Sequence, residues 1–216
     1  MTVVIKRRPT HETLSQLPSL PQVLLRLLNA VSHDTADYQH LADIIRQDAA
    51  TAARLLSIAN SSLYNPHRRC DSIERALMTL GIETVRTLVV TAAVKQYFNQ
   101  FSPRQFRFMQ VFWQRSLMAA QSAQVIATLT RYHSPMEAYV AGLLMDIGQL
   151  CLLAESPEEL LAIAASDARQ TMAEETSVFG ITHCDLGAEL IASWQLDSFT
   201  ADAVRYHHAG IEDIAQ

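Results

Sequence analysis

The sequence has few of the residues that break secondary structure, and few that cross-link a secreted fold. Its 216 residues include 6 Gly, 7 Pro and 3 Cys. So few turn-forming residues argue against a many-stranded sandwich. Three cysteines without a CxxC spacing indicate reduced thiols and a cytoplasmic location rather than a disulfide framework. The glycines also form no P-loop or dinucleotide-binding fingerprint, which excludes nucleotide binding of those kinds.

Long apolar runs and an excess of positive charge are missing as well. No run approaches the roughly 18 consecutive apolar residues of a membrane helix, so we expect no span. Acidic residues outnumber basic ones by 22 to 17, which gives a net charge of -5. A chain with this net charge has no overall positive potential that would attract phosphates or an anionic lipid surface. General nucleic-acid binding and membrane binding are therefore disfavoured.

What the sequence does contain is typical of helices. Apolar residues make up 49% of the chain, and capping boxes that combine Ser, Pro and Glu or Gln predict helix starts at Ser102, Ser134 and Ser156. Apolar residues at helical spacing predict further helices over 21–31, 37–46, 48–60, 72–79 and 82–93. We expect the helix after Ser134 to continue as far as Leu150 with Asp146 inside it. The predicted fold class is all-α.

The apolar pattern lapses between Gln96 and Pro103, and this lapse is the best internal boundary. We therefore divide the chain into a flexible N-terminal segment (1–13), an N-terminal helical lobe (14–100) and a C-terminal helical lobe (101–216). The sequence leaves open whether the chain is a whole protein or one domain of a longer one.

Candidate chemistry gathers in the C-terminal half. An Asp within an apolar helix costs several kcal/mol of desolvation unless a cation meets it. For Asp146 that cation is either a divalent ion shared with His183 and one or both of His207 and His208, or an Arg or His of the same core. His183 also precedes Cys184, but neighbours on a helix point about 100° apart, so we expect no nucleophile–base pair there.

Several strings together resemble the HDOD domain, a bacterial signalling relative of the HD phosphohydrolases. They are Leu17–Pro21, Ile44–Asp48, Leu55–Tyr64, Ser72–Leu77, Ala141–Gly148 and Arg205–His208. The resemblance extends from about Leu14 to His208. It implies an N-terminal helical bundle lobe packed on a C-terminal HD-like helical lobe.

The sequence departs from the metal-binding pattern of the HD hydrolases at two positions. Met145 stands where the His of the His-Asp doublet is expected, and Arg115 stands at the position of the upstream His. A thioether is a poor ligand for hard divalent ions, and a guanidinium repels them. The resemblance therefore implies a vestigial cluster without catalytic residues or cofactor, made of Arg115, Met145, Asp146, His183, His207 and His208. We expect Arg115 to reach Asp146 in place of a metal.

These observations predict a non-catalytic bacterial signal-transduction module that binds a signalling protein or a small nucleotide ligand. The alternative is a metal-dependent phosphohydrolase acting on a nucleotide or cyclic dinucleotide, with a divalent ion on Asp146, His183, His207 and His208. A polar cluster after an apolar helix, formed by Asn60, Ser62 and Tyr64, is the candidate partner-binding surface. We expect this cluster at the seam between the two lobes.

Overall fold

In the computed structural model, every described element is an α-helix. The structure describes residues 22–32, 38–62, 64, 70–99, 106–163 and 168–210. The helices are α2 (Gln22–Ser32), α3 (Tyr38–Arg46), α4 (Ala49–Ala59), α5 (Ile73–Leu80), α6 (Ile82–Phe98), α7 (Phe106–Leu129), α8 (Pro135–Leu144), α9 (Ile147–Glu155), α10 (Pro157–Ile163), α11 (Ala168–Phe179), α12 (His183–Ser193) and α13 (Ser198–Tyr206). The all-α prediction is confirmed for these residues.

Side-chain caps place several helix starts where the sequence predicts them. The Ser134 hydroxyl accepts from the backbone N–H of Glu137 at the start of α8, and Ser72 does the same for Arg75 at the start of α5. Helix α10 begins at Pro157, directly after Ser156. These caps satisfy backbone donors that have no partner inside the helix. The predicted start at Ser102 and the N-terminal segment 1–13 lie outside the described residues.

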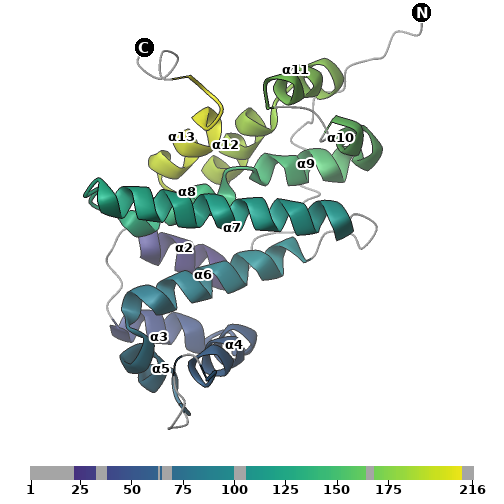
Figure 1. The fold of residues 1–216 in the computed structure, drawn as a ribbon. Helices are drawn as coiled ribbons and strands as arrows, with labels where there is room; N and C mark the ends of the chain where they lie inside the picture. Colours follow the sequence, from purple (N-terminus) through teal and green to yellow (C-terminus); the bar gives the residue numbers. More distant parts are fainter. Residues whose placement is uncertain are drawn as a thin grey trace, which may run out of the picture.

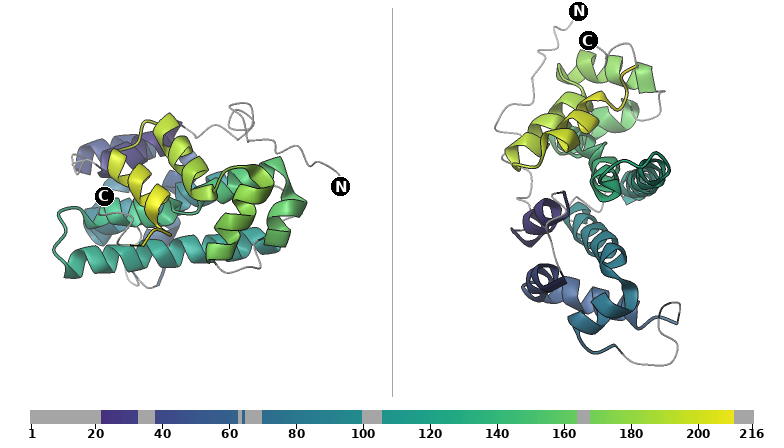
Figure 2. Two further views of the ribbon diagram at one scale, coloured as in Figure 1. Left: turned by 90° about the horizontal axis from the view of Figure 1, so that it is seen from above. Right: turned by 90° about the vertical axis from the view of Figure 1, so that its left-hand side faces the viewer.

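The helices form an elongated stack (Figures 1 and 2). Helices α3, α4 and α5 lie at one end, α2 and α6 cross above them, and α7 and α8 follow. Helices α9 to α13 lie at the other end. Helix α8 contacts α7, α13, α2 and α6, so it links the two ends of the stack. One continuous apolar cluster includes residues from α2 to α13, and the division into lobes at residues 100 and 101 stays a prediction.

The expectation of an unbroken helix around Asp146 is wrong. Helix α8 ends at Leu144 and α9 begins at Ile147, so Asp146 occupies the junction as the N-cap residue of α9. Its side chain makes no capping hydrogen bond. The carboxylate is therefore free to face the other helices that meet at this junction.

The segment Pro135–Glu155, which contains this junction, is long and apolar enough to cross a membrane by length and composition. The sequence predicts no such segment, because its uninterrupted apolar runs are short. Of its most apolar window, 83% is buried inside the protein. This burial is what a core helix shows, since its apolar side chains pack against other helices.

Two glycines set the distance between α9 and α12. A Cβ at Gly148 would overlap the backbone of His183 and approach the Gly187 nitrogen to 2.7 Å. A Cβ at Gly187 would in turn lie 3.2 Å from the Gly148 nitrogen on α9, and 2.8 Å from Cγ1 of Val204 on α13. Without side chains at these two positions the helix backbones touch, which brings the start of α12 beside Asp146.

Candidate functional site

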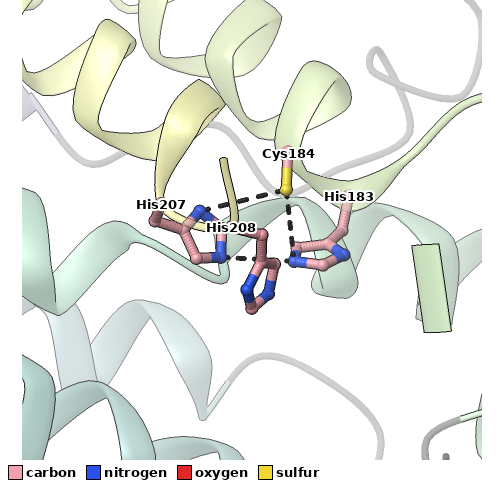
Figure 3. A group of neighbouring side chains, drawn as sticks. All are labelled: His183, Cys184, His207 and His208. Carbon is pink, nitrogen blue, oxygen red and sulfur yellow. Dashed lines mark hydrogen bonds between the residues drawn. The ribbon is translucent and has the colours of Figure 1, made fainter. Parts of the chain in front are cut away.

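The site lies where the start of α12 meets the end of α13 and the α8–α9 junction (Figure 3). The Thr182 hydroxyl caps α12 by accepting from the backbone N–H of Asp185, which places His183 and Cys184 in the first turn. Helix α13 ends at Tyr206, and His207 and His208 follow directly. Because α12 packs against α13, the residues in the first turn of α12 lie beside the two histidines that follow α13.

Three polar atoms face one another at the centre of the site. Nε2 of His183 lies 3.4 Å from Nε2 of His207. Each of these nitrogens is 3.5 Å from Oδ1 of Asp146. Asp146 and His183 are buried, so bulk water does not separate the three groups.

The outer contacts of the two imidazoles fix which nitrogen carries hydrogen. Nδ1 of His183 lies 2.8 Å from a carboxylate oxygen of Glu175, which is fully buried and also accepts from the His183 backbone N–H at 2.8 Å. Nδ1 of His207 donates to the Val204 carbonyl at 2.7 Å. Because carboxylates and carbonyls only accept, each neutral imidazole turns the lone pair of its Nε2 inward. The inward side therefore consists of acceptors and calls for a cation.

Arg115 supplies one cation from α7. Its Nη2 atom lies 3.1 Å from Oδ2 of Asp146, and the contact expected from the sequence is thus present. The Arg115 side chain is 50% exposed, whereas Asp146 is 1% exposed. Oδ2 accepts no hydrogen bond within the described residues. The guanidinium thus reaches the carboxylate from the surface without a directed hydrogen bond.

The expectation that Cys184 stands apart from the histidines is wrong. Its Sγ atom lies 3.6 Å from Nε2 of His183 and 3.9 Å from Nδ1 of His207. The angle between successive side chains separates their Cβ directions, but the His183 ring is long enough to turn back toward the sulfur. The thiol therefore belongs to the cluster.

These contacts shift the pKa values of the central groups. Burial by itself raises the pKa of Asp146, but contacts with His207, Arg115 and His183 outweigh it and hold the pKa below the ordinary value. Burial lowers the pKa of His183, yet Cys184 and Glu175 raise it to about 10. Burial likewise lowers the pKa of His207, and Asp146 and Cys184 raise it to about 9. In the absence of metal, protons supply the positive charge that the acceptors require.

The pKa values of His208 and Cys184, the two remaining members of the cluster, are both lowered. Burial, followed by the neighbouring charges of His207 and His183, lowers the pKa of His208 to about 4. Burial raises the pKa of the Cys184 thiol, but His183 and His207 outweigh it and bring the pKa to about 7. Near neutral pH the site thus contains one neutral imidazole and a thiol close to ionisation.

The residues present fit a single divalent ion. His183, Cys184, His207 and His208 each offer a ligand atom, and these atoms all lie within 4.8 Å of one another. The Asp146 carboxylate adds oxygen donors next to them. Met145 is half-buried and is the C-cap residue of α8. Its thioether makes no hydrogen bond within the described part of the chain.

The candidate partner-binding residues are not at the seam, so that expectation is wrong. They follow α4 at the end of the stack away from α9–α13 (Figure 1). The Asn60 amide donates to the carbonyls of Leu56 and Cys70 and accepts from the Cys70 N–H, all at 2.7 Å. Asn60 is thereby committed to the backbone. Ser62 and Tyr64 are exposed, and their role in partner binding stays a prediction.

Two further residues of the site were not among those predicted from the sequence. Glu175 lies on α11, and nothing in its local pattern distinguishes it from the neighbouring Glu174, which is only half-buried. Gln149 donates from Nε2 to Oδ1 of Asp146 at 3.1 Å. Its spacing of three residues from Asp146 was the one available signal, because residues three apart share a helix face.

A family model described as the HDOD domain matches residues 17–210 of this chain. An uncharacterized protein of Treponema pallidum is 21% identical over 201 residues, which cover 91% of this chain and 38% of the relative. This chain thus spans well under half of that protein's length.

Solved structures share the fold. A crystal structure of an HDOD domain protein with unknown function from Geobacter sulfurreducens is 29% identical, with a TM-score of 0.76, and the match covers 94% of this chain and 69% of the other. A protein from Marinobacter aquaeolei VT8, described as a "Putative signal transduction protein", is 25% identical with a TM-score of 0.72. That match covers 97% of this chain and 48% of the other.

Proposed function

The chain belongs to the HDOD domain family, and we propose that it is a non-catalytic signal-transduction module that binds a regulatory partner. The partner is a signalling protein or a small nucleotide ligand of a bacterial cell. We further propose that residues 14–100 and 101–216 act as two lobes, an N-terminal bundle and an HD-like lobe, and that the protein is cytoplasmic. The description of the Marinobacter relative as a signal transduction protein supports this assignment.

One observation carries the non-catalytic part of the proposal. Nη2 of Arg115 lies 3.1 Å from Oδ2 of Asp146, where a metal-dependent hydrolase needs its carboxylate free for a divalent ion. A guanidinium keeps its proton at neutral pH, so it acts neither as a ligand nor as a base. It also occupies the Oδ2 side of Asp146, where an ion bound by this carboxylate would have to lie. Phosphoester hydrolysis of this type needs a held ion and an activated water, and Arg115 opposes both.

The test is a hydrolysis assay with the full chain. We expect no turnover of cyclic dinucleotides, nucleotides or a generic phosphodiester with Mg²⁺, Mn²⁺ or Fe²⁺ present. Turnover that disappears in Asp146→Ala, while circular dichroism shows an unchanged helix content, would overturn the proposal. Turnover that persists in that variant identifies a contaminating enzyme instead.

A metal-dependent phosphohydrolase is the second candidate, and the inward-facing acceptors favour it. Asp146, His183, His207 and His208 would hold the divalent ion, and such an ion supplies a water of lowered pKa as nucleophile. Glu175 would orient His183 through Nδ1, and the Val204 carbonyl would orient His207. In this function Arg115 would bind a substrate phosphate, because its fork of donors suits phosphate oxygens. Arg115→Ala would then reduce turnover by weakening substrate binding, whereas the non-catalytic proposal expects no turnover in either protein.

A further inference from the structure

We propose that the Cys184 thiolate joins the imidazoles of His183, His207 and His208 as the fourth ligand of a bound zinc ion. The thiol proton of Cys184 and the Nε2 protons of His183 and His207 leave to solvent when the metal binds. The inference goes beyond the proposed function, because a zinc site is possible with or without hydrolytic activity.

Two donor spacings, both measured from His183, match those of one tetrahedral ion. Zn–N bonds of about 2.1 Å and a Zn–S bond of about 2.3 Å separate two nitrogens by about 3.4 Å, and nitrogen from sulfur by about 3.6 Å. Nε2 of His183 lies 3.4 Å from Nε2 of His207 and 3.6 Å from Sγ of Cys184. Figure 3 shows His208 beside these three groups, and its ligand atom lies within 4.8 Å of the others.

The surroundings orient two of the ligands in advance. The Glu175 carboxylate holds Nδ1 of His183, and the Val204 carbonyl holds Nδ1 of His207. A carboxylate or carbonyl behind an imidazole is the usual outer contact of a metal-bound histidine, because it fixes the ring and the tautomer. Both Nε2 lone pairs therefore face the position that an ion would occupy.

The Asp146 carboxylate adds a negative charge beside the proposed ligands. Oδ2 of Asp146 is buried and accepts no hydrogen bond in the described part of the chain. Oδ1 lies 3.5 Å from Nε2 of both His183 and His207. A zinc ion between the imidazoles would place a double positive charge next to this carboxylate, and Arg115 would share the remaining negative charge from the surface.

The thiolate decides which metal is bound. Mg²⁺ and Mn²⁺ prefer oxygen donors, whereas thiolate together with imidazole favours zinc. Four protein ligands also fill a tetrahedral zinc ion, and such closed sites are structural, because catalytic zinc keeps one position for water. Cys184 therefore converts a histidine cluster into a closed site that ties the start of α12 to the end of α13.

The test uses chelator-treated full-length protein titrated with Zn²⁺ and Co²⁺. We expect one Zn²⁺ per chain, a rise in melting temperature with zinc, and a thiolate-to-cobalt charge-transfer band with Co²⁺. Cys184→Ser should lose the band and bind Zn²⁺ more weakly by at least about 100-fold, the upper range for loss of an outer contact. Cys151→Ala removes another buried thiol, which lies outside the cluster. This control variant should keep the charge-transfer band and the Zn²⁺ affinity of the wild type.

Two results would overturn the inference. The first is folded wild-type protein that binds no zinc, and the second is Co²⁺ binding without a charge-transfer band. If Cys184→Ser does not fold, alkylation of the wild type decides, since zinc should protect Cys184 from iodoacetamide and undiminished labelling contradicts ligation. A positive zinc result with measurable hydrolysis would reject only the proposed function, so the two failures are distinguishable.

Discussion

At the scale of single residues, the pair of Asp146 and Arg115 decides how the site carries its charge. The carboxylate is almost fully buried, while the guanidinium is half-exposed. Solvent screening therefore weakens the attraction compared with a fully buried pair. The histidines share the charge of Asp146 from the inner side, so Arg115 is one of several groups that hold this carboxylate ionised.

We predict that Arg115→Ala lowers the free energy of unfolding by about 1–3 kcal/mol, because Asp146 loses a charged partner. Combining it with Asp146→Asn should cost less than the sum of the two single changes, since the amide carries no charge to leave unpaired. Urea unfolding of the four proteins at pH 7, with chelator present, gives the coupling energy. Arg115→Lys is the matched control that retains the charge, and strict additivity would contradict the pairing.

At the scale of elements, close packing at two glycines brings the parts of the site together. Gly148 on α9 and Gly187 on α12 let the two backbones touch. This contact sets the depth at which His183 lies beside Asp146. Gly142 plays the same part between α8 and α7, where a Cβ would lie 2.9 Å from the backbone of Ala119. Helix spacing, rather than any single side chain, therefore determines the geometry of the cluster.

We predict that Gly148→Ala destabilises the protein by about 1–3 kcal/mol or more, because the added methyl overlaps the backbone of His183. It should also weaken Zn²⁺ binding, since α12 must shift away from α9. Thermal unfolding and zinc titration measure the two effects. Ala192→Ser, at an exposed position of α12, is the control. A variant with unchanged stability would show that α9 and α12 are not in close contact.

At the scale of the whole molecule, protonation of the cluster links stability to pH. The pKa values of His183 and His207 are raised to about 10 and 9 from an ordinary value of 6.5. Their contribution to stability is complete below pH 6.5 and is lost as the pH rises through 9 to 10. The pKa of His208 is lowered to about 4, so its contribution is present above pH 6.5 and is lost as the pH falls toward 4.

We therefore predict that the metal-free protein is most stable near pH 6.5 and loses stability on both sides. Urea unfolding between pH 4 and pH 10, with chelator throughout, measures the profile. Glu175→Gln should flatten the alkaline side, because Glu175 contributes to the raised pKa of His183. Stability that is constant between pH 7 and pH 10 would contradict the assigned shifts.

The sequence by itself determined the helices and the family. Capping residues such as Ser72 and Ser134 act on backbone groups within four residues, so their effect can be read locally. Helical spacing of apolar residues needs only a short window as well. Asp146, His183, His207 and His208 were recognisable because metal-ligand residue types stood out in an apolar half, and the family strings fixed their order.

Only the tertiary structure decided which of these side chains touch. The partners Glu175 and His183 stand eight residues apart across a turn, and Cys184 meets His207 from a different helix. The row of exposed apolar side chains on α7, which includes Val111, Met118 and Val125, was also invisible. Helix α7 instead buries the small residues Ser116 and Ala120, and Gly142 of α8 packs closely on the backbone of Ala119 and Ala120. Contacts of this kind depend on how closely two backbones approach, and short-range propensity does not encode that distance.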